Sequence, residues 1–95
     1  VNLMRTNRLT TQQQSDFSWK QLAGCGYGLG VRTHTLPEKS GLICSPGEFG
    51  WGGAAGATAI VDPEINLGVF YVQHTLNPRE EYYQPRLRNI IYSCL

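Results

Sequence analysis

The most informative stretch of the sequence is Phe49-Gly50-Trp51-Gly52-Gly53-Ala54-Ala55-Gly56. Its four Gly and two Ala residues open an extended apolar pattern that continues to residue 61. Gly loses the most backbone entropy on folding, so this composition weakens a strand and needs a reason. One reason is close approach, because N–H groups without neighbouring Cβ atoms can reach a bound carbonyl, as an oxyanion hole requires. The alternative is a bulge or a tight crossing of strands, which needs no ligand.

Further extended segments flank this stretch. Residues 26–34 alternate larger side chains, such as Tyr27 and Val31, with glycines, which predicts a strand with one nearly bare face. A bare face allows another segment to lie close against it. Residues 35–48 carry the Pro and Gly of a loop, and residues 62–66 predict a turn. Residues 67–74 are apolar on both faces, so we expect a central strand, covered twice and paired antiparallel with the preceding one.

Both ends of the chain carry helical signals. Residues 1–23 are polar and predict a short helix or turn followed by a loop. Asn77-Pro78-Arg79-Glu80 reads as a helix start, but Pro85 interrupts it, so the main helix is predicted at about 85–94. The apolar side chains of this helix form one stripe, which we expect to pack against the sheet. They are Leu87, Ile90, Ile91, Cys94 and Leu95.

These elements predict an α+β fold, in which antiparallel sheet strands are followed by a C-terminal helix. A single helix covers one face of a sheet, whereas the predicted central strand needs cover on both faces. We therefore expect residues 1–95 to form the C-terminal segment of one larger domain, whose remainder supplies the second layer.

Composition limits the expected partners. The 95 residues carry a net charge of +1, and 16% of them are charged, which offers no broad basic surface for nucleic acid. No apolar run is long enough for a membrane-spanning helix, so no membrane partner is expected. Three Cys and two His at wide spacing indicate neither a disulfide framework nor a metal site, and reduced core cysteines are expected. The odd Cys count slightly favours the cytoplasm, and localisation is otherwise open.

Several polar residues are predicted to have structural and not chemical roles. His34 and His74 end strands and are expected at the surface, because neither has an acidic partner at short spacing. Asp62 and Glu64 are assigned to a turn and not to a carboxylate pair for acid/base chemistry. Arg88 falls on the polar side of the last helix and is expected to be solvated.

Three ordered motifs resemble one family: Gly26-Tyr-Gly-Leu-Gly-Val31, Trp51-Gly-Gly-Ala-Ala-Gly56 and Val61-Asp-Pro-Glu64. They are similar to the last quarter of serine hydrolases of the class C β-lactamase type, which include β-lactamases, D-Ala-D-Ala peptidases and family VIII carboxylesterases. The resemblance implies an antiparallel sheet with helices on both faces, and hydrolysis through an acyl-enzyme on the Ser of Ser-x-x-Lys. Neither this motif nor the family's Tyr-x-Asn occurs in the sequence, so the nucleophile and base are expected outside it.

The family's third motif, Lys-Thr-Gly, falls on Trp51, Gly52 and Gly53, so the first two positions differ. Trp-Gly-Gly resembles the carboxylesterase-like branch. Without the Lys, a substrate carboxylate loses a cationic partner, and an indole offers an apolar wall, so uncharged esters or amides are the expected substrates. Ala54 matches the position whose backbone N–H supplies half of the family's oxyanion hole.

The resemblance thus implies substrate binding by Trp51, Gly52 and Gly53 and a catalytic N–H at Ala54, without cofactor or metal. The implied partners are a small-molecule ester, amide or β-lactam and the remainder of the same domain. Two alternatives stay open. The glycine-lined strand could bind a peptide or small ligand by strand addition in a non-catalytic module, or a receptor of this fold could sense penicillin by staying acylated.

Overall fold

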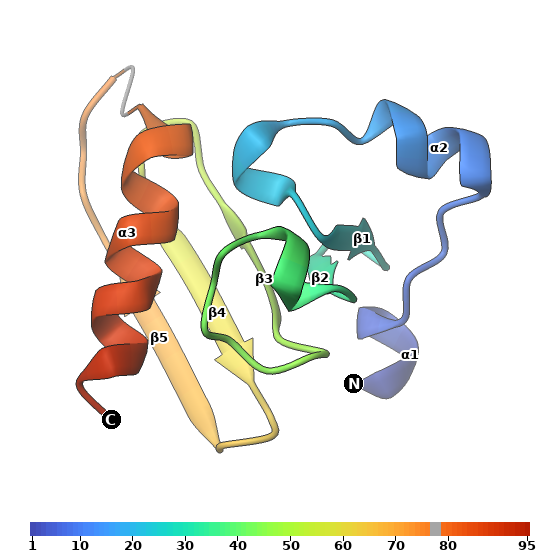
Figure 1. The fold of residues 1–95 in the computed structure, drawn as a ribbon. Helices are drawn as coiled ribbons and strands as arrows, with labels where there is room; N and C mark the ends of the chain where they lie inside the picture. Colours follow the sequence, from blue (N-terminus) through green and yellow to red (C-terminus); the bar gives the residue numbers. More distant parts are fainter. Residues whose placement is uncertain (77–78) are drawn as a thin grey trace.

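A computed structural model of the chain describes residues 1–76 and 79–95. Within them, five strands form one antiparallel sheet in chain order, and a long C-terminal helix lies over one face of it (Figure 1). This is the predicted α+β arrangement. The elements are α1 (Asn2–Arg5), α2 (Thr11–Asp16), η1 (Lys20–Leu22), β1 (Cys25–Tyr27), β2 (Arg32–His34), η2 (Pro37–Lys39), β3 (Phe49–Gly52), β4 (Thr58–Asp62), β5 (Leu67–Tyr71) and α3 (Glu80–Ser93).

Two segments that were predicted as single strands are hairpins. Residues 26–34 fold back on themselves, because Gly30 adopts a φ of +79° and the Gly28 N–H donates to the Val31 carbonyl at 2.8 Å. Residues 49–61 turn after β3, where the Gly53 N–H donates to the Ala57 carbonyl at 2.7 Å. Turn geometry at these glycines, and not strand pattern, decides the number of strands.

The bare face of β1 is covered as expected. A Cβ at Gly26 would collide with the side chain of Asn7, and one at Gly28 would collide with the Met4 carbonyl. The Asn7 side chain also accepts a hydrogen bond from the Tyr27 N–H at 3.1 Å. The N-terminal residues therefore run along β1 at a separation that only glycine permits.

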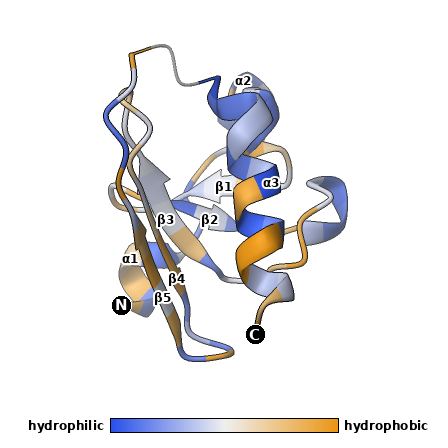
Figure 2. Ribbon diagram, turned by 90° about the vertical axis from the view of Figure 1, so that its left-hand side faces the viewer, coloured by the Kyte–Doolittle hydropathy of each residue, from blue (hydrophilic) through white to orange (hydrophobic). Residues whose placement is uncertain are grey.

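The prediction that residues 67–74 form a central strand is wrong. In the described residues β5 pairs with β4 alone, ends at Tyr71 and is an edge strand. Figure 2 shows α3 on one side of β4 and β5; the short helix α1 is drawn on the other side, but Figure 1 places it near β1 and β2, away from these two strands. Phe70 on this open face is 76% exposed. The apolar side chains that suggested cover on both faces of β5 are thus solvent-exposed on one of them.

Helix α3 begins at Glu80 and continues through Pro85, so its predicted start at about 85 is wrong. The predicted capping residues, Asn77 and Pro78, lie outside the described residues. Pro85 lies in the second turn, where it removes one backbone hydrogen bond and its ring crowds the Glu81 carbonyl, so it weakens this turn without ending the helix.

The side of α3 that faces the sheet agrees with the prediction only in part, since Leu87 and Ile91 are half-buried. Gln84 and Arg88 are buried, whereas Ile90 and Leu95 of the predicted apolar stripe are 61% and 72% exposed. The Tyr92 hydroxyl donates to the Asp62 carboxylate of β4 at 2.7 Å. Gln84, Arg88 and Tyr92, which are four residues apart and lie on one side of the helix, therefore pack α3 against the sheet.

No helix among the described residues has the length and apolar character required to span a bilayer.

Candidate functional site

One end of β3 has a free edge. Strand β2 pairs with β3 only through Thr33 with Phe49 and Arg32 with Gly50. On its other side β3 stays paired with β4 as far as Gly52. Among the described residues, the β3 edge from residue 51 onward therefore has no neighbouring strand on the β2 side. An extended ligand can approach the backbone at this position.

The four residues predicted to form the site lie together at this end of the sheet. Trp51 and Gly52 end β3, and Gly53 and Ala54 enter the turn that follows. This turn is closed by the Gly56 N–H, which donates to the Gly53 carbonyl at 3.0 Å. Ala54 is exposed, and within the described residues its N–H donates to no backbone carbonyl. The structure thus places an unused N–H at the tip of the hairpin.

The glycines of this stretch fall into two groups. A Cβ at Gly50 would collide with the backbone carbonyl of Ala59, so close strand packing explains this residue. At Gly52 and Gly53 the nearest atoms would lie at 3.6 Å and 3.9 Å from the added Cβ, which is ordinary contact distance. Strand packing therefore accounts for Gly50 but not for Gly52 and Gly53, where an added Cβ would meet no clash.

A cavity of about 230 Å³ opens beside this edge. Its walls come from β3, from the segment around η1, and from the first turns of α3. The lining residues are Trp19, Gln21, Leu22, Arg32, Trp51, Gly52, Thr58, Glu80 and Gln84. The Trp51 ring is held edge-on by Tyr27, with ring centroids 5.5 Å apart. The predicted substrate-binding residues Trp51 and Gly52 therefore line a pocket that the folded chain forms itself.

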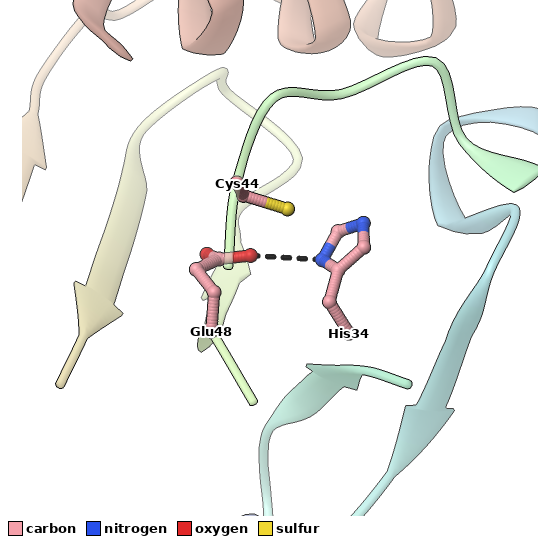
Figure 3. A group of neighbouring side chains, drawn as sticks. All are labelled: His34, Cys44 and Glu48. Carbon is pink, nitrogen blue, oxygen red and sulfur yellow. Dashed lines mark hydrogen bonds and ion pairs between the residues drawn. The ribbon is translucent and has the colours of Figure 1, made fainter. Parts of the chain in front are cut away.

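A cluster of buried charges lies under the same strand and was missed by the sequence analysis. Glu48, which is completely buried, accepts hydrogen bonds from Arg32 at 2.9 Å and 3.0 Å. It also accepts from Arg88 of α3, and His34 Nδ1 lies 2.8 Å from the same carboxylate (Figure 3). The predictions of a surface His34 and a solvated Arg88 are wrong, because these residues are 1% and 2% exposed. Mutual ion pairing makes their burial possible.

The protonation states in this cluster follow from its hydrogen bonds. Burial alone would raise the pKa of Glu48, but the His34 hydrogen bond and the two arginines outweigh it and hold the pKa at about 2. Burial lowers the pKa of His34, so the imidazole is neutral and its Nδ1–H donates to the carboxylate. The Cys25 sulfur lies 3.4 Å from Nε2 of His34, and burial raises the pKa of this thiol to about 11.

This thiol, imidazole and carboxylate are the groups of a nucleophilic relay, but the protonation and burial of the thiol do not fit that role. A nucleophilic Cys needs thiolate character and access, and Cys25 is protonated and 1% exposed. We therefore assign Cys25, His34 and Glu48 to the packing of the sheet against α3.

The same cluster contains three possible metal-binding atoms. Donor atoms of His34, Cys44 and Glu48 lie within 4.8 Å of one another. Both carboxylate oxygens already bind guanidinium groups, and burial raises the pKa of Cys44 to about 11, which keeps the thiol protonated. Two neighbouring positive charges and a protonated thiol oppose the binding of a metal cation.

The remaining predictions have mixed outcomes. His74 is exposed, as expected. Asp62 and Glu64 do stand at a turn, where an Asp62 carboxylate oxygen accepts the Glu64 N–H at 3.2 Å, but Asp62 is itself fully buried. Cys25 and Cys44 are buried free thiols, whereas Cys94 is exposed and lies outside the core. None of these residues borders the cavity at Trp51.

Comparison with known proteins gives one family and two relatives. Residues 2–92 match the family described as Beta-lactamase. Two Mycobacterium tuberculosis proteins, Protein Rv1367c and Uncharacterized protein MT1414, are each 39% identical to the chain over 80 residues. The aligned segment covers 78% of this chain and 20% of each relative, so the chain spans about a fifth of their length.

Proposed function

Because this chain belongs to the Beta-lactamase family, we propose that it is the C-terminal segment of a serine hydrolase that works through an acyl-enzyme. The substrates would be esters, amides or β-lactams. The open edge of β3, with the unused Ala54 N–H at its end, is the observation that carries this proposal. The exposed face of β4 and β5 is where the rest of the domain would pack.

The geometry of this edge supports the roles that we propose for its residues. The Ala54 N–H would donate to the oxyanion that forms when the nucleophilic Ser, outside residues 1–95, attacks the substrate carbonyl. Gly52 and Gly53 would leave room for the substrate against the strand. Trp51 would supply an apolar wall where a Lys would otherwise attract a carboxylate. Substrates without a carboxylate at this position are therefore favoured.

Replacing Ala54 with Pro tests the oxyanion role directly. The Gly56-to-Gly53 hydrogen bond makes Ala54 the second residue of a β-turn, a position that favours Pro, so the hairpin should persist. Ala54→Pro removes the N–H, and Ala54→Gly is the matched control that keeps it. In the full-length protein we expect kcat for ester hydrolysis to fall about 10²- to 10³-fold with Pro and to change little with Gly. Equal activity of the two variants would contradict the assigned role.

Labelling with a fluorophosphonate tests the reaction class. The reagent should modify one Ser outside residues 1–95 in the full-length protein and nothing in the 95-residue chain. Modification of the short chain would refute the proposal, and a full-length protein that binds ligands without labelling would support the non-catalytic module. A label retained without turnover of a chromogenic ester or lactam would instead identify a penicillin-sensing receptor.

A further inference from the structure

The cavity beside Trp51 contains one acidic group that is not neutralised. The Arg32 guanidinium is already engaged, because its two terminal nitrogens donate to the two carboxylate oxygens of Glu48. Glu80, by contrast, has no ion-pair partner among the described residues. Its closest polar contact in the cavity is the Gln21 amide, at 3.5 Å. Arg32 and Arg88 share the one carboxylate of Glu48, so the buried cluster keeps a net positive charge, while Glu80 is the negative group of the cavity itself.

Two tryptophan side chains line the same cavity. Trp19 and Trp51 are 60% and 41% exposed, so both rings are accessible to a ligand. Each ring is supported by a neighbouring aromatic side chain, Trp19 by Phe17 with ring centroids 5.9 Å apart and Trp51 by Tyr27. The face of an indole attracts a cation, and Trp is the strongest aromatic partner for one.

We propose that this cavity binds an alkylammonium group, with the charge held by Glu80 and the carbon substituents packed against the two indoles. A carboxylate in the same place would be repelled by Glu80, because the guanidinium of the lining Arg32 is already bound by both oxygens of Glu48. As a statement about substrates, this inference rests on the proposed function: the hydrolase would prefer esters or amides that carry an amine or a quaternary ammonium group near the carbonyl. Binding of the cation itself does not require the hydrolytic reaction.

A structural role for Glu80 makes a different prediction. Glu80 and Glu81 both stand in the first turn of α3, where negative charge stabilises a helix. Only Glu80 lines the cavity. Replacing each in turn with Gln therefore separates ligand binding from helix stability, since both variants lose one first-turn charge.

The experiment is a titration of the full-length protein with tetramethylammonium chloride, followed by isothermal titration calorimetry. The remainder of the domain is present in this protein, so the cavity beside Trp51 is tested in its complete setting. We expect a saturable change with a millimolar dissociation constant. Glu80→Gln should weaken binding about tenfold, while Glu81→Gln leaves it unchanged. Far-UV circular dichroism of each variant monitors the fold.

Three results would overturn the inference. They are an equal response to sodium chloride, equal binding by Glu80→Gln and the unmodified chain, and sodium acetate binding as tightly as tetramethylammonium. Failure of the hydrolase proposal would show separately, as absence of fluorophosphonate labelling, and would leave this titration unaffected. If Glu80→Gln loses its circular dichroism spectrum, the Trp19→Phe variant gives the second measurement. It should bind more weakly, and unchanged binding would refute the role of the indole.

Discussion

Replacing Glu48 with Gln should strongly destabilise the fold. The carboxylate is fully buried and receives hydrogen bonds from Arg32, Arg88 and His34. The substitution keeps the size of the side chain but removes its charge, so two buried guanidinium groups lose their common counter-ion. Breaking one buried ion pair costs about 3–5 kcal/mol because the remaining charge is stranded. A chain of this size has a total stability of roughly 5–15 kcal/mol, so a large share is at risk.

Thermal denaturation measures the effect. For a domain of this length each kcal/mol lowers the midpoint by about 4–8 °C, which predicts a drop of at least about 12 °C. Glu64→Gln is the matched control, because that side chain is exposed and should change the midpoint by less than about 3 °C. Adding Arg88→Met to Glu48→Gln removes one stranded charge and should restore part of the loss. A loss below about 1 kcal/mol, or a double variant no better than the single one, would refute this account.

Two further predictions follow from the same strand and cluster. Gly50→Ala should lower the free energy of unfolding by several kcal/mol, because its Cβ meets the Ala59 carbonyl. Gly52→Ala should leave the unfolding midpoint nearly unchanged and weaken tetramethylammonium binding by filling the cavity. Equal midpoints for both variants would contradict the assignment of Gly50 alone to strand packing. Stability should also fall on acidification, because the pKa of His34 lies below its ordinary 6.5 in the folded chain and that of Glu48 falls from 4.5 to about 2. As the pH falls, the unfolded chain therefore binds protons at these two groups before the folded chain does. The urea midpoint of unfolding should be highest above pH 6.5 and decline down to about pH 2. A midpoint that does not change with pH would contradict the assigned protonation states.

The sequence predicted the class of fold because that class depends on local signals. Strand alternation, the turn after Asp62 and the helical spacing near the C-terminus act over a few residues. The residues from Trp51 to Ala54 are consecutive, so any fold keeps them together. The hairpins were harder to predict, since a glycine that turns the chain and a glycine inside a strand look alike until backbone angles are known.

The buried cluster could not be predicted for a different reason. Glu48 lies 16 residues from Arg32 and 40 from Arg88 along the chain, and each of the three looks like a surface residue by itself. Their burial becomes favourable only when all are present. One local signal existed, because Arg32 and His34 are two apart and point to the same face of β2. For α3 the apolar stripe predicted the inner face only in part: Leu87 and Ile91 are half-buried, but the buried Arg88 was missed because hydrophobic spacing carries no information about ion pairs elsewhere.

The polar docking of α3 has a consequence for its freedom of movement. Packed elements can shift past each other by small slides or, more drastically, by one whole turn. Arg88 and Tyr92 each engage one specific carboxylate, on Glu48 and Asp62, so a slide of one turn, about 5.4 Å, would break both bonds at once. These two bonds therefore fix the position of α3 along its own axis. Glu80, two turns before Arg88, is kept at the mouth of its cavity by bonds made at the opposite end of the helix.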